Sequence, residues 1–296
     1  MAVEKQKVLF DTDIGSDIDD AVALAYLLSQ PRCDLLGITT VTGEPELRAE
    51  MASAMCRNVG RNDIPIHAGC PEALLIEMRQ KQAPQARALG GWPRQQGFAP
   101  NTAVEFLRET IRASPGEVTL LATGPMTNLG LLFAVDPEIP SLLRQLVLMC
   151  GRYFDRMQGE WNAIGDPHAT AIVYGAGCQT QPPRHLSVGL DVTTQCRLSA
   201  DLCRERFTAK VLQPVRDFAE VWFERADRIT FHDPLTAACV FEPSLCTYQE
   251  GKVHVSLAPP TMGWTVFSDR TEDKPHAIAA RVNSQRFFDH YFEIVK

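Results

Sequence analysis

The sequence KVLFDTDIGSDIDD, residues 7–20, runs from an apolar stretch through five carboxylates into a helical pattern. Residues 7–11 predict a β-strand, and residues 19–29 predict a helix with one apolar face. In open α/β sheets, ligands bind beyond the carboxyl ends of the strands. The segment therefore predicts a strand–helix unit with a ligand site directly after its strand.

Short apolar runs alternate with helical patterns through most of the remaining chain, which is typical of parallel βαβ units. Further strands are predicted at 35–41, 117–122, 145–150 and 185–191. Further helices are predicted at 45–59, 101–113, 126–135, 199–205 and 209–227, and an antiparallel hairpin at 252–257 and 263–268. We expect an α/β fold with a mostly parallel, Rossmann-like open sheet flanked by helices.

The length of 296 residues allows one large α/β domain or two small ones. Residues 82–100 have the composition of a linker, but the strand–helix alternation resumes after them. Long loops in compact domains are usually functional or disordered. We therefore expect one domain over residues 1–296, with a mobile loop over the site at about 82–100.

The charge balance argues against whole classes of partner. Acidic residues number 36 against 29 basic ones, and both nucleic acids and anionic membranes attract a cationic surface instead. No apolar run approaches the ~18–20 residues that span a bilayer, and no signal peptide is recognisable. Nine cysteines without a C-x-x-C pair fit neither a disulfide framework nor a zinc site. These features predict a soluble, cytoplasmic protein that binds neither nucleic acid nor membrane.

The carboxylates between residues 11 and 20 are too many for helix capping, which accounts for one or two acids near a helix N-terminus. Like charges this close repel one another unless a cation lies among them. Oxygen ligands without His or Cys indicate Ca²⁺ or Mg²⁺. An EF-hand is excluded because that loop needs glycine where Ser16 stands and glutamate where Val22 stands.

This segment and six others, in the same order, resemble the inosine–uridine preferring nucleoside hydrolase family. Residues 8–24, VLFDTDIGSDIDDAVAL, are similar to the family's D-x-D-x-G-x-D-D signature. The other segments are GITTVTG (37–43), LATGPMTNL (121–129), VLM (147–149), EWN followed by DP (160–167), GLDVT (189–193) and HDP (232–234). The resemblance implies the nucleoside hydrolase fold and a homodimer or homotetramer. It also implies Ca²⁺-dependent hydrolysis of a ribonucleoside, purine or pyrimidine, to ribose and free base.

The resemblance further implies that Ca²⁺ is bound by the carboxylates of Asp13, Asp20 and Asp233 and by the backbone carbonyl of Thr123. Cleavage of the C1′–N bond passes through an oxocarbenium-like transition state and needs an activated water. Asp13 is the candidate general base, because a divalent ion lowers the pKa of its bound water. His232 is the candidate general acid, because an unperturbed pKa of ~6.5 lets it carry a proton near neutrality.

Other residues are expected to bind the substrate. Asp19 is predicted to face the ribose diol. Glu160 and Asn162 stand two apart, so on an extended segment they would share a face and bind other sugar hydroxyls. Met149, at the end of its strand, is a further candidate, and so is Glu44, which stands where the family usually has Asn.

The chain also departs from the family pattern. Its acidic loop is two residues longer, so Asp17 competes with Asp19 and Asp20 for the paired acids. The family's H-G-x-x-G segment is missing, and an asparagine that binds the sugar has no counterpart in residues 155–158. Four aromatic residues are candidates either for stacking on the base or for the core: Tyr153, Trp161, Trp222 and Phe231.

Two alternative functions remain open from the sequence. Residues 10–13 resemble the start of haloacid-dehalogenase-type phosphatases, with Asp11 as nucleophile and Asp13 as acid and base. That motif normally has Thr or Val where Gly15 stands. The altered sugar and base segments also allow a non-catalytic, metal-dependent nucleoside or ribose binder.

Overall fold

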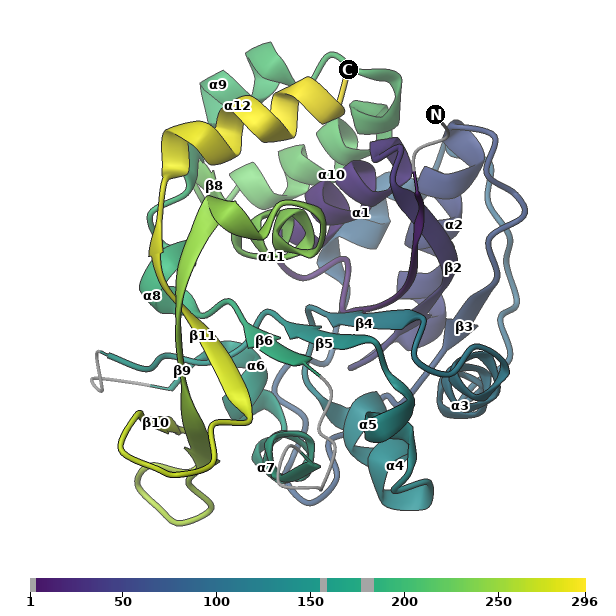
Figure 1. The fold of residues 1–296 in the computed structure, drawn as a ribbon. Helices are drawn as coiled ribbons and strands as arrows, with labels where there is room; N and C mark the ends of the chain where they lie inside the picture. The colour runs from purple at the N-terminus through teal and green to yellow at the C-terminus, as the bar shows by residue number, and fades with distance from the viewer. Residues whose placement is uncertain (1–3, 155–158, 177–183) are drawn as a thin grey trace.

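The first strand, β1 (Gln6–Thr12), pairs in parallel with β2 (Cys33–Thr40) on one side and with β4 (Val118–Ala122) on the other. The computed structural model describes residues 4–154, 159–176 and 184–296. In this part of the chain nine strands form one sheet, in the order β10-β9-β11-β6-β5-β4-β1-β2-β3 (Figure 1). The remaining strands of the sheet are β3 (Ile66–Ala68), β5 (Gln145–Leu148), β6 (Arg184–Ser187), β9 (Cys246–Val255), β10 (Thr265–Ser268) and β11 (His276–Val282).

The sheet is parallel from β3 to β11, and β9 and β10 extend it as antiparallel strands at one edge. Its strands β3-β2-β1-β4-β5-β6 follow the order of the Rossmann fold, in which the chain changes direction across the sheet between the first and fourth strands. Ligands bind in the crevice outside the strands at this switch point. The predicted fold class, a single α/β domain with a mostly parallel sheet, is confirmed.

Helices cover both faces of the sheet (Figure 1). One face carries α1 (Asp19–Ser29), α2 (Pro45–Asn58), α9 (Ala200–Arg206), α10 (Gln213–Phe223), α11 (His232–Phe241) and α12 (Ser284–Ile294). The other carries α3 (Ala103–Ala113), α4 (Thr127–Val135), α5 (Ile139–Leu142) and α7 (Pro167–Gly175). Side chains of β1 alternate between the layers: Val8 and Phe10 pack on the first side and Leu9 on the second.

No helix among the described residues is both long and apolar enough to cross a membrane. The eight cysteines in the described part are all free thiols.

Several predicted boundaries change in the structure. The strand predicted at 185–191 ends at Ser187, and a short helix, α8 (Leu190–Thr193), follows it. The helix predicted at 209–227 is shorter, because a 3₁₀ turn precedes α10 and Pro214 lies at the first turn of that helix. The C-terminal hairpin is confirmed as β9 and β10.

Other elements were not predicted. They include β3, the helix α7, the strand β11, the helix α12, and the small antiparallel pair β7 (Arg197–Ser199) and β8 (Arg228–Thr230). The strand β11 reads HAIAARV, whose alanines favour a helix, and only its pairing with two neighbouring strands makes it extended.

Residues 82–100 are partly ordered by packing. They contain a 3₁₀ helix, η1 (Pro84–Leu89), in which Gln85 and Leu89 are buried. Farther along, Arg94 forms an ion pair with Glu50 at 2.8 Å, which ties the segment to α2. The mobility of this segment stays a prediction.

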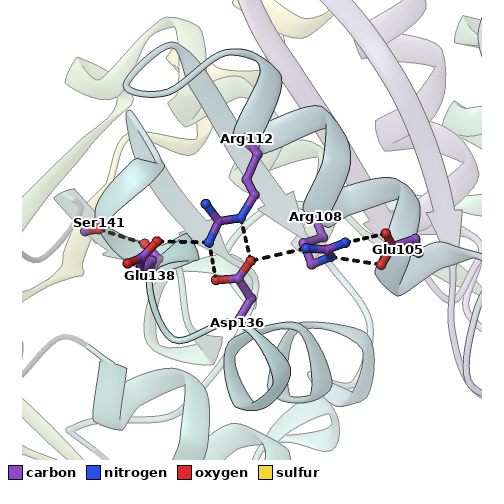
Figure 2. Close-up of polar contacts among 6 residues, drawn as sticks. All are labelled: Glu105, Arg108, Arg112, Asp136, Glu138 and Ser141. Carbon is purple, nitrogen blue, oxygen red and sulfur yellow. Dashed lines mark hydrogen bonds and ion pairs between the residues drawn. The ribbon is translucent and has the colours of Figure 1, made fainter.

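Ion pairs tie α3 to the connection between α4 and α5 (Figure 2). Arg112 donates from Nε and Nη2 to the two carboxylate oxygens of Asp136, at 2.6 and 2.7 Å. Its Nη2 also donates to Glu138 at 2.9 Å. Arg108 lies 3.8 Å from Asp136 and pairs with Glu105 on its own helix. Asp136 is thus shared by two arginines of α3.

Candidate active site

The carboxyl ends of β1, β4 and β5 meet at one cavity. Asp13 follows β1, Thr123 follows β4 and Met149 follows β5, each directly after the last residue of its strand. All three line a cavity of about 240 Å³. The cavity therefore lies at the switch point of the sheet, where this topology is expected to bind its ligand.

Two helix N-termini complete the acidic wall of the cavity. Asp19 and Asp20 lie in the first turn of α1, and Asp233 lies in the first turn of α11. A helix N-terminus stabilises nearby negative charge. The backbone N–H of Asp233 also donates to Oδ2 of Asp19 at 3.0 Å. As a result, these three buried carboxylates each place an oxygen within 4.8 Å of the others.

The electrostatics of this wall call for a cation. Burial, reinforced by Asp20, raises the pKa of Asp13 to about 8. Burial raises the pKa of Asp20 to about 6 and, together with neighbouring carboxylates, raises those of Asp19 and Asp233 well above their usual range. Positive charge among these oxygens would favour the ionised form of the cluster near neutral pH. The donor set, carboxylate oxygens without His or Cys, fits a hard divalent cation such as Ca²⁺.

Asp20 is oriented by two hydroxyl groups. Thr12 Oγ1 donates to Oδ1 of Asp20, and Thr123 Oγ1 donates to the same oxygen at 3.0 Å. Both hydrogen bonds lower the pKa of Asp20 against the effect of burial. Strands β1 and β4 therefore hold one carboxylate of helix α1 in place.

Glu160 does not lie on the extended segment that the sequence predicts, because residues from Trp161 to Gly165 form a helix, α6. Glu160 is the N-cap of that helix. Its Oε1 accepts from the backbone N–H of Asn162 at 2.7 Å, and its Oε2 accepts from that of Ala163 at 2.9 Å. An N-cap carboxylate of this kind satisfies N–H groups that have no partner inside the helix. Glu160 nevertheless lines the cavity.

Asn162 also lines the cavity and joins two of its loops. Its Nδ2 donates to the backbone oxygen of Thr123 at 2.6 Å and to that of Met149 at 3.1 Å. The carbonyl of Thr123, the predicted metal ligand, thus accepts one hydrogen bond already. Because a carbonyl oxygen has two lone pairs, one remains for a cation.

His232 is the first residue of α11 and lines the cavity. Its Nδ1 lies 2.7 Å from Oγ1 of Thr193, within hydrogen-bond distance. Burial, and next the charge of Arg197, lowers the pKa of His232 to about 4. This shift favours the neutral imidazole near pH 7, and the role of His232 as general acid stays a prediction.

Glu44 is the one predicted site residue that does not line the cavity. Its backbone is left-handed, with a φ of 60°, immediately before α2. This conformation directs the exposed side chain to the segment that follows, where Oε2 accepts from the N–H of Ala83 at 2.8 Å. The structure therefore does not bring Glu44 together with the other predicted residues.

The four candidate aromatic residues divide into two pairs. Trp161 and Trp222 line the cavity, and Trp161 is 47% exposed there. Tyr153 and Phe231 are buried in the core instead. Residues 155–158, where the family asparagine has no counterpart, lie outside the described residues.

Further residues line the cavity without having been predicted to do so. They are Ser16, Gln80, Leu190 and Arg225. Asp17, which the sequence leaves as a competitor for the paired acids, lines the cavity as well. Arg225 follows α10, and its Nη2 donates to the backbone oxygen of Ser16 at 2.8 Å. Ser16 and Leu190 lie within segments that resemble the family, but no local signal marks Arg225, because a charge in a helical pattern usually lies on a solvated face.

Comparison with known proteins identifies the family. The family model described as inosine-uridine preferring nucleoside hydrolase matches residues 8–289. The chain is 32% identical over 285 residues to probable uridine nucleosidase 2 of Arabidopsis thaliana, covering 89% of this chain and 86% of the relative. It is 31% identical over 309 residues to the pyrimidine-specific ribonucleoside hydrolase RihA of Citrobacter koseri, covering 95% of each.

Comparison of the fold with solved structures also identifies nucleoside hydrolases. A solved plant nucleoside hydrolase, the PpNRh1 enzyme, superposes with a TM-score of 0.84 at 26% identity and covers 98% of both chains. These matches favour neither a phosphatase nor a protein that only binds nucleosides. The chain belongs to the inosine-uridine preferring nucleoside hydrolase family and is an N-glycosyl hydrolase.

Proposed function

We propose that this protein uses Ca²⁺ to hydrolyse the N-glycosidic bond of a ribonucleoside, giving ribose and the free base. The observation that carries the proposal is the single cavity lined by Asp13, Asp20, Thr123 and Asp233, the four residues proposed to bind the ion. When bound, Ca²⁺ would keep these carboxylates ionised, lower the pKa of the attacking water and hold ribose hydroxyls.

Asp13 is the proposed general base. It lines the cavity beside Asp20, where it can accept a proton from the attacking water. Burial raises the pKa of Asp13, which favours proton transfer to it, and a bound Ca²⁺ would oppose that rise. In the transition state positive charge develops on the ribose ring, which the surrounding carboxylates stabilise.

Asp19, Glu160, Asn162 and Met149 are proposed to bind the sugar. Asp19 is oriented by the N–H of Asp233, and Glu160 by the N–H groups of its own helix. A carboxylate has about four lone-pair positions, so both retain acceptor capacity for ribose hydroxyls. Because their rotamers are already held in the free protein, little conformational entropy is lost when the sugar binds.

His232 is proposed to act on the departing base. A neutral imidazole donates one hydrogen bond from the nitrogen that carries its proton. With Nδ1 held by the hydroxyl of Thr193, Nε2 is the nitrogen available to donate. A hydrogen bond from Nε2 would stabilise the negative charge that develops on the base as the C1′–N bond breaks.

The relatives support pyrimidine ribonucleosides as the first substrates to test, because they are named for uridine and for pyrimidines. We include purine ribonucleosides in the proposal, since the base-binding side of the cavity departs from the family pattern. A cytoplasmic location, a homodimer or homotetramer, and a role in nucleoside salvage remain part of the proposal.

The test is a reducing-sugar assay over uridine, cytidine, inosine, adenosine and guanosine, with Ca²⁺, with Mg²⁺, or with a chelator. We expect ribose release from at least one nucleoside with Ca²⁺ and loss of release with the chelator. If the Ca²⁺-loaded protein binds nucleosides by calorimetry but releases no ribose, it is a binder and the catalytic proposal fails.

A further inference from the structure

Arg48 is an unusual cation, because it lies in α2 with none of its surface exposed. Arginine is almost never fully buried unless it is paired with an acid. Within the described residues, Arg48 forms no ion pair with a carboxylate at 4 Å or less. Its guanidinium instead donates to backbone oxygens, so the reason for its burial has to be found in the segments that it binds.

Three of the six hydrogen bonds of this side chain reach the start of the acidic loop, which we define as residues 13–18, and two run from Nε to the carbonyls of Thr42 and Gly43. Nη1 of Arg48 donates to the carbonyl oxygens of Asp13 and Ile14, the latter at 3.0 Å, and to Oγ of Ser16 at 2.8 Å. Nη2 donates to the carbonyl of Gln82 at 3.1 Å. One side chain therefore joins the acidic loop to the segment that follows Gln80, a residue of the cavity wall.

The next two carbonyls of the loop are bound by other elements. The backbone N–H of Gln85 donates to Gly15 and its Nε2 donates to Ser16, both at 3.2 Å. Arg225 donates to the same oxygen of Ser16. Four successive carbonyls, 13 to 16, thus accept hydrogen bonds from outside the loop.

The loop also lies close against α2. Gly15 has a φ of 112°, and a Cβ at this position would lie 2.8 Å from Sδ of Met51. The close approach brings the loop backbone within reach of Arg48. The carbonyl oxygens of Asp13 and Ile14 point toward the guanidinium of Arg48. Their negative ends are therefore compensated by that cation and add less negative potential at the carboxylates of the site. The charge of Arg48 also opposes the rise in the pKa of Asp13 and of Asp20.

We propose that Arg48 is a positioning residue that holds the acidic loop in the conformation that binds the divalent cation. The inference rests on the metal site in the proposed function. It explains what fixes a loop two residues longer than the family signature: donors on α2, on η1 and directly after α10 bind carbonyls 13 to 16, up to the start of the added length.

Substitutions at position 48 can distinguish the effect of hydrogen-bond geometry from the effect of positive charge. Arginine offers five donors in a planar fork, whereas lysine offers three from a single nitrogen. A lysine at position 48 would retain the positive charge but could not bind the loop and Gln82 through separate nitrogens. If charge alone mattered, lysine would suffice, and a neutral side chain would strengthen cation binding by removing a repulsive neighbour.

The experiment compares chelator-treated full-length protein with its Arg48→Lys and Arg48→Met variants by calorimetric titration with Ca²⁺. We expect both variants to bind Ca²⁺ about 10–100-fold more weakly than the wild type, the range found when groups that support metal ligands are removed. Terbium emission sensitised by Trp161 and Trp222, which line the cavity, gives a second readout that does not depend on activity.

Two further variants serve as controls. Leu107→Ala opens a cavity in the core on the opposite face of the sheet, so it lowers stability without reaching the loop and should leave Ca²⁺ affinity unchanged. Gln85→Ala removes one side-chain donor to the loop and should weaken Ca²⁺ binding less than the Arg48 variants. If Arg48→Met does not fold, Gln85→Ala serves as the second test of whether hydrogen bonds to the acidic loop support Ca²⁺ binding.

The outcomes are distinct. Wild-type affinity in Arg48→Lys, or tighter binding in Arg48→Met, overturns the inference and leaves the proposed metal site intact. If the wild-type protein itself binds no Ca²⁺, the proposed metal site fails and this inference fails with it. Weaker binding in both Arg48 variants, with an unchanged Leu107→Ala control, supports the positioning role.

Discussion

The hydrogen bonds of each carboxylate decide which acids of the first loop can act on a substrate. Asp11 is fully buried, and its Oδ1 accepts from Thr39 and from Asn128. It does not line the cavity, so it cannot be the nucleophile that a haloacid-dehalogenase-type reaction requires. Asp13, two residues later, faces the cavity. Residues two apart on a strand share a face, so it is the turn beginning after Thr12, the last residue of β1, that separates the two acids.

Replacing Asp13 by Asn should lower kcat by about 10²–10⁴-fold, the usual contribution of a general base. The variant should fold, because removing a charge from a crowded cluster relieves repulsion. Steady-state ribose release and thermal unfolding measure the two effects. Asp269→Asn, at an exposed position, is the control and should keep full activity. An Asp13→Asn variant with more than a tenth of the wild-type kcat would remove the base role.

Replacing His232 by Gln should slow the reaction most for nucleosides whose base is a poor leaving group. A hydrogen bond to the departing base matters less when the leaving group is already stable as an anion. We therefore expect a large decrease in kcat with uridine and a small one with an activated aryl riboside. Equal losses on both substrates would contradict a role at the leaving group and indicate a structural one.

At the scale of elements, the site is built where helices begin and strands end. The N-termini of α1 and α11 supply three carboxylates, and the ends of β1, β4 and β5 supply the residues beside them. Away from the site, α3 is held to the α4–α5 connection by Asp136 and its arginines (Figure 2). That contact contributes to stability alone.

Asp136→Asn should lower the melting temperature at pH 7. The difference in melting temperature between wild type and variant should become smaller below about pH 4. The hydrogen bonds from Arg112 hold the pKa of Asp136 below its usual value. A carboxyl group with a lowered folded-state pKa stabilises the fold above its unfolded pKa of about 3.9, and this stabilisation disappears as the pH falls through the folded value. Thermal unfolding of wild type and variant from pH 7 to 3.5 measures the difference.

Glu205→Gln is the matched control for this experiment, because Glu205 is exposed and forms no ion pair within the described part of the chain. It should unfold like the wild type at every pH. A constant difference between wild type and Asp136→Asn down to pH 3.5 would show that the ion pair is not the cause.

At the scale of the whole molecule, Ca²⁺ should stabilise the protein against heat. A ligand at about 100 times its Kd adds about 2.7 kcal/mol, which corresponds to an increase in Tm on the order of 5 °C for a chain of this size. The increase in Tm caused by Ca²⁺ should become larger from pH 6 to pH 8. The raised pKa values of Asp13 and Asp20 mean that the calcium-free fold binds extra protons and loses stability as they dissociate with rising pH. Differential scanning fluorimetry with Ca²⁺ or chelator tests this, and an unchanged Tm would count against the metal site.

Much of the α/β plan could be predicted from local patterns. The strand at residues 7–11 and the helix at 19–29 agree with the structure within one residue at each end, because hydrophobic periodicity depends on neighbours in sequence. The strand β11 could not be predicted, since its alanines become extended only by pairing with β6 and β9. The extended segment predicted for Glu160 and Asn162 was wrong because Glu160 caps a helix there.

For the site, the clustering of carboxylates after the first strand and the succession of family motifs were readable in the sequence alone, since both are local arrangements of residues. Tertiary packing decided the rest. It brought Asp233 against Asp19 across 214 residues and turned Glu44 away from the cavity. It also buried Arg48 beneath the acidic loop and lowered the pKa of His232. Burial and the distances between charges depend on which elements pack together, and one stretch of sequence does not contain that information.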